Sequence, residues 1–89
     1  MEKSIRAKLK KCQPYFIEKD LIDKLYFKDD ENNTEYWIFK YVFITGLSDL
    51  AIAVRLNFAS KNTVYLKTLK IIERNFSIIN NFLENYEQI

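Results

Sequence analysis

The sequence predicts an all-α fold, a small helical domain of four to five helices that spans residues 1–89. The first reason is chain reversal, because the 89 residues include one Gly and one Pro, too few for the repeated tight turns of an all-β domain. The second is spacing, since apolar residues recur every three or four positions. The third is composition: 48% hydrophobic and 16% aromatic residues supply one buried core.

Two helices are predicted in the first 26 residues. The first runs from Ser4 to about Cys12 and is short, basic and amphipathic. Pro14 forces the residue before it towards extended backbone, so Gln13 is a boundary. The second helix runs from about Tyr15 to Tyr26. Its apolar positions recur at helical intervals: Ile17, Leu21, Ile22, Leu25 and Tyr26.

A polar segment, residues 28–33, separates these helices from the next one. It contains no apolar residue and is rich in turn-forming types, so we expect a loop. Asn33 or Thr34 then caps a helix that runs from Glu35 to about Thr45. This stretch is apolar nearly all round, which is typical of a helix at the centre of a core. A buried β-strand is the alternative, because aromatic and β-branched residues dominate the stretch.

The next helix is predicted between two small polar signals. Gly46 can adopt the left-handed conformation that ends the preceding helix, and Ser48 can cap a new one. The new helix carries Ile52 and Leu56 on one face. The small Ala53 beside them allows another helix to approach closely.

A tight turn then leads into the following helix. Asn57 suits a left-handed C-cap, Phe58 plugs the turn and Ser60 caps the next helix. Two short helices that meet through a three-residue turn have the spacing of a helix-turn-helix. The sequence therefore predicts a central helix-turn-helix at about residues 48–74.

The last helix is predicted to be long. Leu66 and Leu69 lie on its flank, and we expect both to be buried. The apolar series continues to about Tyr86, with a break near Asn75–Phe76. This wide stripe either packs within the monomer or forms a homodimer seam through the C-terminal helix. Three earlier positions point inward at helical spacing: Val64, Thr68 and Ile71.

The order of these signals resembles a known motif over residues 35–74. It is similar to the helix-turn-helix in the fourth region of bacterial sigma factors and in small phage transcription activators of the ArpU and RinA type. The sequence departs from their pattern at Ala51, Asn57 and Ala59. The resemblance implies a phage or mobile-element transcriptional regulator that inserts a recognition helix, about residues 60–74, into the major groove of DNA. The matching residues are Tyr41, Gly46, Leu47, Ser48, Ile52, Ala53, Leu56, Ser60, Thr63 and Val64.

If this helix reads double-stranded DNA, its spacing assigns the contacts. Asn62 pairs with adenine, and Lys61 reaches guanine or phosphate. Ser60 and Thr63 hydroxyls suit phosphate oxygens. The alternative is that these residues do not contact DNA: the lysines are then ordinary solvated charges, and the hydroxyls only cap the helix. The remaining candidates are Tyr65 and Lys67 on the groove-facing side, and Arg55, Lys70 and the basic residues near the N-terminus as phosphate contacts.

The charge pattern is compatible with such a surface. The net charge is only +2, but residues 1–12 and 61–75 are basic and residues 13–35 are acidic. Two basic segments that fold onto one face form a phosphate-binding surface, whereas solvated surface charge is the alternative.

Composition argues against an enzyme and against a cofactor or metal. The chain has no His and a single Cys, so neither a thiolate–imidazole pair nor a zinc site can form, and Cys12 is expected to be a small buried apolar residue. The acids of residues 29–31 lack the ligand spacing of a calcium loop and read as a solvated turn. No secretory signal and no apolar run of roughly 20 residues is visible, so the sequence predicts a cytoplasmic protein without membrane contact.

A second function stays open beside DNA binding. The chain is alternatively a protein-binding module or an inhibitor of a host nucleic-acid enzyme. In that case the acidic segment 18–35 imitates phosphate charge and the helix-turn-helix is only a scaffold. RNA polymerase or another host protein is then a possible partner in either function.

Overall fold

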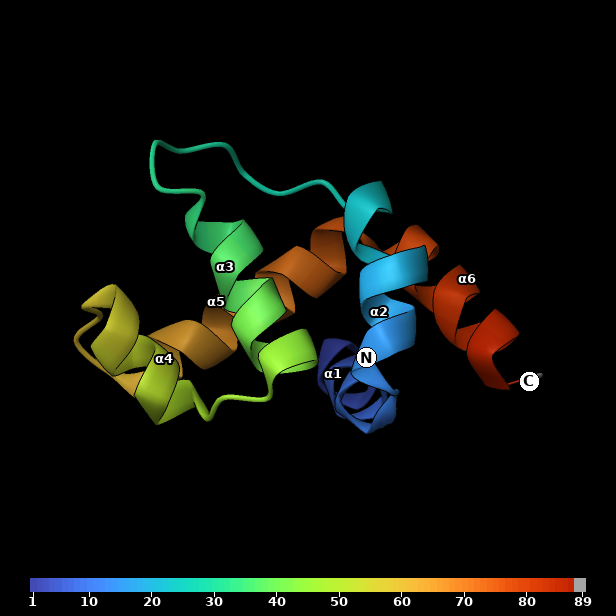
Figure 1. Cartoon of the computed structure of the whole chain (residues 1–89), viewed down its shortest axis with the longest axis horizontal. Coiled ribbons are helices and arrows are strands. Elements are labelled where there is room, and N and C mark those ends of the chain that lie inside the picture. Colours follow the sequence, from blue (N-terminus) through green and yellow to red (C-terminus); the bar gives the residue numbers. More distant parts are fainter. Residues whose placement is uncertain (88–89) are drawn as a thin grey trace.

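The all-α prediction is confirmed. A computed structural model describes residues 1–87, and residues 88 and 89, which the predicted domain includes, lie outside the described part. Within residues 1–87 the chain forms helices and no strand (Figure 1). Asn75 divides the predicted C-terminal helix, so the described α-helices number six rather than four to five. They are α1 (Glu2–Lys11), α2 (Pro14–Asp20), α3 (Thr34–Lys40), α4 (Asp49–Leu56), α5 (Lys61–Arg74) and α6 (Phe76–Glu87).

The boundary between α1 and α2 agrees with the prediction, whereas the C-terminal end of α2 does not. The boundary at Gln13 is confirmed, because Gln13 is extended and Pro14 opens α2. The predicted extension of α2 to Tyr26 is wrong: the helix stops at Asp20, and one 3₁₀ turn follows at Ile22–Lys24. The chain then becomes extended because the buried side chain of Asn75 binds both backbone groups of Tyr26. A contact made 49 residues away thus overrides the local helical spacing.

The aromatic segment is a helix and not a strand. Helix α3 continues directly into a π-helical turn at Tyr41–Thr45. Its N-terminus is capped in a way that the sequence did not predict, because neither Asn33 nor Thr34 caps it with a side chain. Instead, Oδ1 of Asp30 accepts hydrogen bonds from the N–H groups of Asn32 and Thr34 at 2.9 and 3.0 Å. The backbone N–H of Thr34 is the main reason why the pKa of Asp30 lies below its ordinary value.

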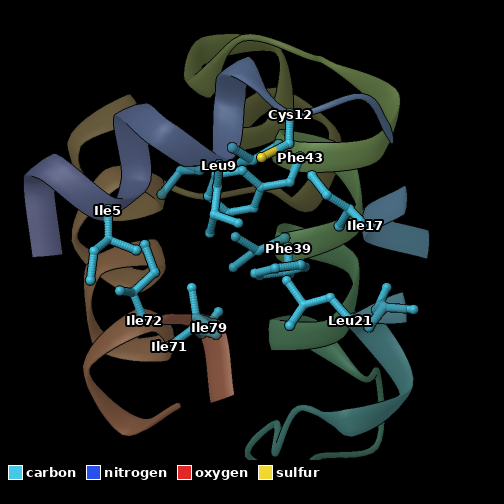
Figure 2. Close-up of a cluster of buried hydrophobic side chains, with 14 of the residues drawn as sticks. Ile5, Leu9, Cys12, Ile17, Leu21, Phe39, Phe43, Ile71, Ile72 and Ile79 are labelled. Atoms are coloured by element: carbon cyan, nitrogen blue, oxygen red, sulfur yellow. The ribbon is translucent and has the colours of Figure 1, made fainter. Parts of the chain in front are cut away.

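The prediction that this segment lies at the centre of the core is confirmed, although only one side of it is buried. Ile38, Phe39 and Phe43 are almost fully buried, whereas Trp37 is 36% exposed. Trp37 and Tyr41 pack against one another at the surface, with ring centroids 5.5 Å apart. The inner face nevertheless occupies the centre of the core, as Figure 2 shows for Phe39 and Phe43.

The core draws side chains from every helix. Leu9, Ile17, Phe39 and Ile71 have no exposed surface, and Figure 2 shows them converging with Leu21, which directly follows α2. Cys12 is buried as predicted, at 6% exposure. Burial raises the pKa of its thiol, and the nearby Glu87 charge adds to the effect.

The C-terminal stripe packs mainly within the chain. The break at Asn75 is confirmed, and α6 buries Ile79 and Leu83 in the same core. Ile78 stays 40% exposed, beside a groove of about 400 Å³ between α2 and α6 that is also lined by Phe16 and Phe82. None of the described helices has the length and apolar character needed to cross a bilayer.

Candidate nucleic-acid interface

Helices α4 and α5 lie where the sequence predicts the two helices of a helix-turn-helix. Residues 57–59 lead from Leu56 to Ser60, which occupies the N-cap position of α5 as predicted. Asn57 is left-handed, with φ +63°, and the N–H of Phe58 donates to the carbonyl of Ala53 at 2.8 Å. This pattern ends a helix and turns the chain sharply. Phe58 packs half-buried on the core and so fixes the turn.

The start of α4 also follows the prediction. Gly46 is left-handed, with φ +78°, and ends the preceding helical segment. Oγ of Ser48 accepts a hydrogen bond from the N–H of Ala51 at 3.1 Å. This bond satisfies one of the free donors in the first turn of α4. Ile52 and Ala53 face the core, with 0% and 2% exposure.

Helix α5 has one buried and one exposed face. Val64, Thr68 and Ile71 are completely buried, as the spacing predicts. The opposite face carries Asn62, Leu66, Lys70 and Glu73, all of them exposed. The expectation that Leu66 is buried is therefore wrong, since it is 50% exposed, whereas Leu69 is half-buried. Helical geometry places Leu66 one turn from both Asn62 and Lys70, at the middle of the outward face.

The N-terminus of α5 is open to solvent. Lys61 and Asn62 are exposed, and Ser60 occupies the N-cap position without a side-chain bond to the helix. The prediction that Ser60 caps with its hydroxyl is thus wrong. The Oγ atom of Ser60 lies instead 3.4 Å from Oγ1 of Thr63. The N–H of Thr63 donates to the carbonyl of Ser60 at 3.2 Å, whereas helix geometry leaves the N–H groups of Lys61 and Asn62 without an intrahelical partner.

Three of the predicted contact residues are engaged elsewhere in the fold. The ring of Tyr65 lies under the guanidinium group of Arg6, 4.8 Å from centroid to Cζ. The ammonium group of Lys67 lies 5.8 Å from the ring of Phe58. Arg55 is exposed, but its guanidinium group lies 5.4 Å from the ring of Tyr41. The Tyr65 ring is therefore covered by Arg6 and poorly placed to contact DNA. The Arg55 side chain, in contrast, remains exposed to solvent.

A buried polar network behind α5 was not predicted. Nε of Arg6 donates to Oγ1 of Thr68 at 2.8 Å, and Nη2 donates to both carboxylate oxygens of Asp49 at 2.8 and 3.1 Å. The Thr68 hydroxyl donates in turn to the carbonyl of Tyr65 at 2.6 Å. Arg6 was expected to contact phosphate with the other N-terminal cations, and this is wrong, because its side chain is 10% exposed and ion-paired. A sequence signal existed: a hydroxyl at an inward position such as Thr68 needs a polar partner.

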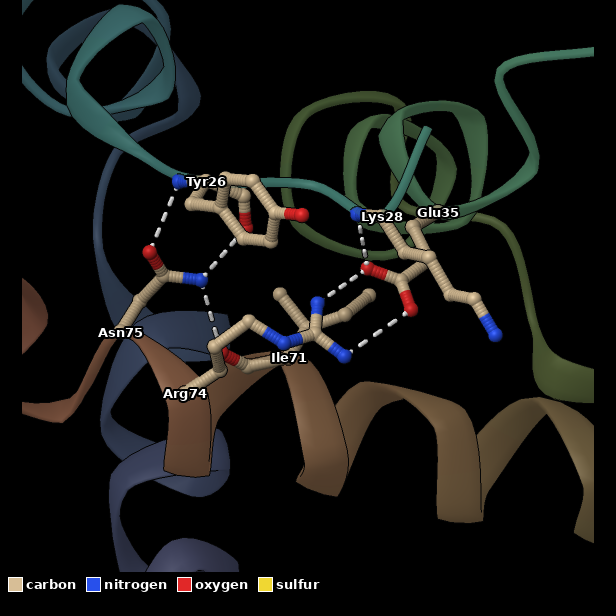
Figure 3. A network of polar contacts seen from close by, with 6 residues as sticks. All are labelled: Tyr26, Lys28, Glu35, Ile71, Arg74 and Asn75. Carbon is tan, nitrogen blue, oxygen red and sulfur yellow. Dashed lines mark hydrogen bonds and ion pairs between the residues drawn. The ribbon is translucent and has the colours of Figure 1, made fainter. Parts of the chain in front are cut away.

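A second network holds the loop and α3 against the C-terminal end of α5 (Figure 3). The Glu35 carboxylate binds the guanidinium group of Arg74 and accepts from the N–H of Lys28 at 2.8 Å. Burial alone raises the pKa of Glu35, but the bonds from Arg74 and Lys28 outweigh it and hold the pKa below its ordinary 4.5. Next to it, Asn75 accepts from the N–H of Tyr26 at 2.8 Å and donates to the Tyr26 and Ile71 carbonyls, both at 2.9 Å.

Helix α1 brings further cations close to the helix-turn-helix. Arg6 joins α1 to both α4 and α5. Lys3 and Lys10 stand three residues before and four residues after Arg6 and so share its flank of α1. Both are exposed. Helix α1 packs against α5, so part of the N-terminal basic segment lies on a helix next to α5.

The helix-turn-helix also presents apolar surface. Leu50 and Val54 on α4 are 60% and 75% exposed and border a shallow hollow with Ala51.

No family model, no curated protein and no solved structure matches this chain. The residues that the structure describes contain no cluster of His, Cys, Asp and Glu that would hold a metal ion.

Proposed function

We propose that the protein binds double-stranded DNA by inserting the N-terminal half of α5 into the major groove. The observation that carries the proposal is the exposed, uncapped start of α5 within a complete helix-turn-helix. In this motif the N-terminal residues of the second helix contact base edges. Asn62 supplies paired hydrogen bonds for adenine, and Lys61 supplies donors for guanine or phosphate.

The surroundings of α5 suit the DNA backbone. The neighbouring hydroxyls of Ser60 and Thr63, together with the N–H groups of Lys61 and Asn62, are donors for one phosphate. Arg55 and Lys70 are exposed and supply further positive charge. Lys67 contributes charge more weakly, because Glu35 lies close enough to it for their charges to interact. Tyr65 has no direct role in this proposal, since Arg6 covers its ring.

The biological role that we propose is regulation of transcription. The resemblance of residues 35–74 to sigma factors and phage activators supports this role, and RNA polymerase is the protein partner that it implies. A cytoplasmic location is part of the proposal, because the DNA of a bacterial or phage regulator is read there.

Fluorescence anisotropy tests the proposal directly. The full chain is titrated into a random-sequence duplex and into the DNA upstream of its own gene, at two salt concentrations. We expect tighter binding to the upstream DNA, and affinity for both duplexes that falls as salt rises. Lys61→Ala should weaken both, and Asn62→Ala should reduce the preference for the upstream DNA.

Matched substitutions at the other end of the molecule serve as controls. Lys19→Ala on α2 and Asn81→Ala on α6 change exposed residues away from α4 (Figure 1), and we expect wild-type binding from both. Absence of salt-dependent binding at micromolar protein would contradict the proposal. Equal losses in the control and α5 variants would contradict the assignment of α5 as the reading helix.

The exposed apolar strip of α4 favours protein binding as the second candidate function. Leu50 and Val54 offer a surface for an apolar helix or strand of a host protein. The acidic segment contributes less to this candidate than its charge suggests, because Asp30 and Glu35 are used within the fold. A pull-down with the wild type and with Leu50→Lys/Val54→Lys tests it. A partner lost only in the double variant would favour this function, and equal capture by both proteins would contradict it.

A homodimer through α6 is the remaining partner proposal. Ile78 is the exposed apolar residue of that helix, while Ile79 and Leu83 are already buried within the chain. Sedimentation of the wild type and of Ile78→Glu tests it. A dimer that the substitution dissociates supports the proposal, and a wild-type monomer at high concentration contradicts it.

A further inference from the structure

One residue on the outward face of α5 does not fit a purely polar reading surface. Leu66 is 50% exposed, although it lies at the centre of that face. Its neighbours one turn away are Asn62 and Lys70, both polar and exposed. Half of its surface is open to solvent. If this face enters the DNA groove, the aliphatic side chain can be matched by an apolar group on a base edge.

The major groove offers only one apolar group, the 5-methyl group of thymine. We propose that Leu66 contacts a thymine methyl group, and that Asn62 and Leu66 together select a site containing adenine and thymine. This inference rests on the proposed function and names the base pairs that the same surface recognises. The cations around α5, Lys61 and Lys70, provide the charge that brings the phosphate backbone to it.

The spacing of the two residues sets the spacing of the bases. Asn62 and Leu66 are four residues apart, which is about 6 Å along a helix that rises about 1.5 Å per residue. Successive bases on one strand are about 3.4 Å apart. A helix lying along the groove therefore places the adenine and the thymine about two base pairs from one another.

Glu73 limits the contact to the N-terminal half of the helix. It lies on the same outward face, two turns beyond Leu66, and is exposed. A carboxylate close to the phosphates is repelled, so the C-terminal end of α5 leaves the groove. The reading surface then comprises Asn62, Leu66 and the side chains next to them.

The test removes the methyl group from the DNA. Binding sites are first selected from a random duplex pool with the full chain, and we expect adenine and thymine about two base pairs apart in the selected site. Each thymine is then replaced in turn by deoxyuridine, which lacks only the 5-methyl group. At one position the wild type should bind about fourfold more weakly, the value expected for one buried methyl group. Leu66→Ala should bind both duplexes equally.

Two further variants make the result specific to Leu66. Leu66→Met keeps an apolar group of similar reach and should retain sensitivity to deoxyuridine. Tyr15→Ala on α2 changes another exposed large side chain and should behave as the wild type. Unchanged far-UV circular dichroism of Leu66→Ala would show that its fold is intact, as expected for an outward position.

The outcomes separate this inference from the proposed function. Salt-dependent binding with no deoxyuridine effect, or the same effect in Leu66→Ala, would overturn the thymine contact and leave DNA binding in place. Absence of salt-dependent binding would overturn both. A deoxyuridine effect that is present in the wild type and lost in Leu66→Ala would establish the contact.

Discussion

Replacing Arg6 by Ala should destabilise the fold more than any other change of a charged residue. Arg6 connects three helices, because its guanidinium group binds Thr68 of α5 and Asp49 of α4. Side-chain exposure is 10% for Arg6 and 22% for Asp49. Substitution therefore leaves a largely desolvated carboxylate without its counterion.

The size of the effect follows from the groups left behind. The Thr68 hydroxyl keeps its bond to the Tyr65 carbonyl and loses one donor, which costs about 1 kcal/mol. The unpaired Asp49 carboxylate costs about 2 kcal/mol, less than a fully buried charge because solvent reaches part of it. The sum of about 3 kcal/mol is a large share of the stability of a domain this small.

Urea unfolding followed by far-UV circular dichroism measures this loss. With an m-value of about 1–3 kcal/mol/M, the midpoint of Arg6→Ala should fall by about 1–3 M. Lys10→Ala, an exposed position on the same helix, is the control and should change little. In a double-mutant cycle with Asp49→Ala, the second substitution should cost much less when Arg6 is already absent. A loss below about 1 kcal/mol, or simple additivity, would refute the reasoning.

Three further predictions concern the other buried polar groups. Asn75→Ala should cost about 2–3 kcal/mol, because the Tyr26 N–H and carbonyl lose their partner, and the Tyr26 amide should exchange hydrogen faster. Glu35→Gln should cost about 1–2 kcal/mol at neutral pH. Since folding lowers the pKa of Glu35, this difference is complete above 4.5, the ordinary value, and disappears as pH falls through the lower folded pKa. Cys12 should react with a thiol reagent at least about tenfold more slowly in the folded chain than in urea, because burial raises its pKa.

Each of these has a result that contradicts it. A Tyr26 amide that exchanges equally in the wild type and Asn75→Ala would show that the Asn75 clamp does not order the loop. A Glu35→Gln deficit that persists at low pH would mean that charge is not what stabilises this position. Rapid labelling of Cys12 in the folded chain would contradict the burial of its thiol after the end of α1.

Local signals in the sequence predicted the helix-turn-helix well. Gly46, Ser48 and Asn57 act through their own backbone or through the next turn, so their roles can be read from neighbouring residues alone. The inward positions of α5 follow from helical periodicity in the same way, and Val64, Thr68 and Ile71 are buried as predicted.

Contacts between distant segments could not be predicted in this way. The end of α2 depends on Asn75, which is 49 residues from Tyr26. The loss of Arg6 from the phosphate-contact set depends on Asp49 and Thr68, which are 43 and 62 residues away. Whether Leu66 is exposed depends on which face of α5 the other helices cover. Periodicity alone cannot predict this, because a buried apolar stripe and an exposed one have the same spacing.

The most direct test of the central claim is an amide chemical-shift map of the isotope-labelled chain titrated with its selected duplex. We expect the shifts to concentrate at residues 60–66 and at Arg55, and the groove between α2 and α6 to be unaffected. Shifts confined to that groove, or no shifts at all, would contradict the claim that α5 is a DNA-reading helix.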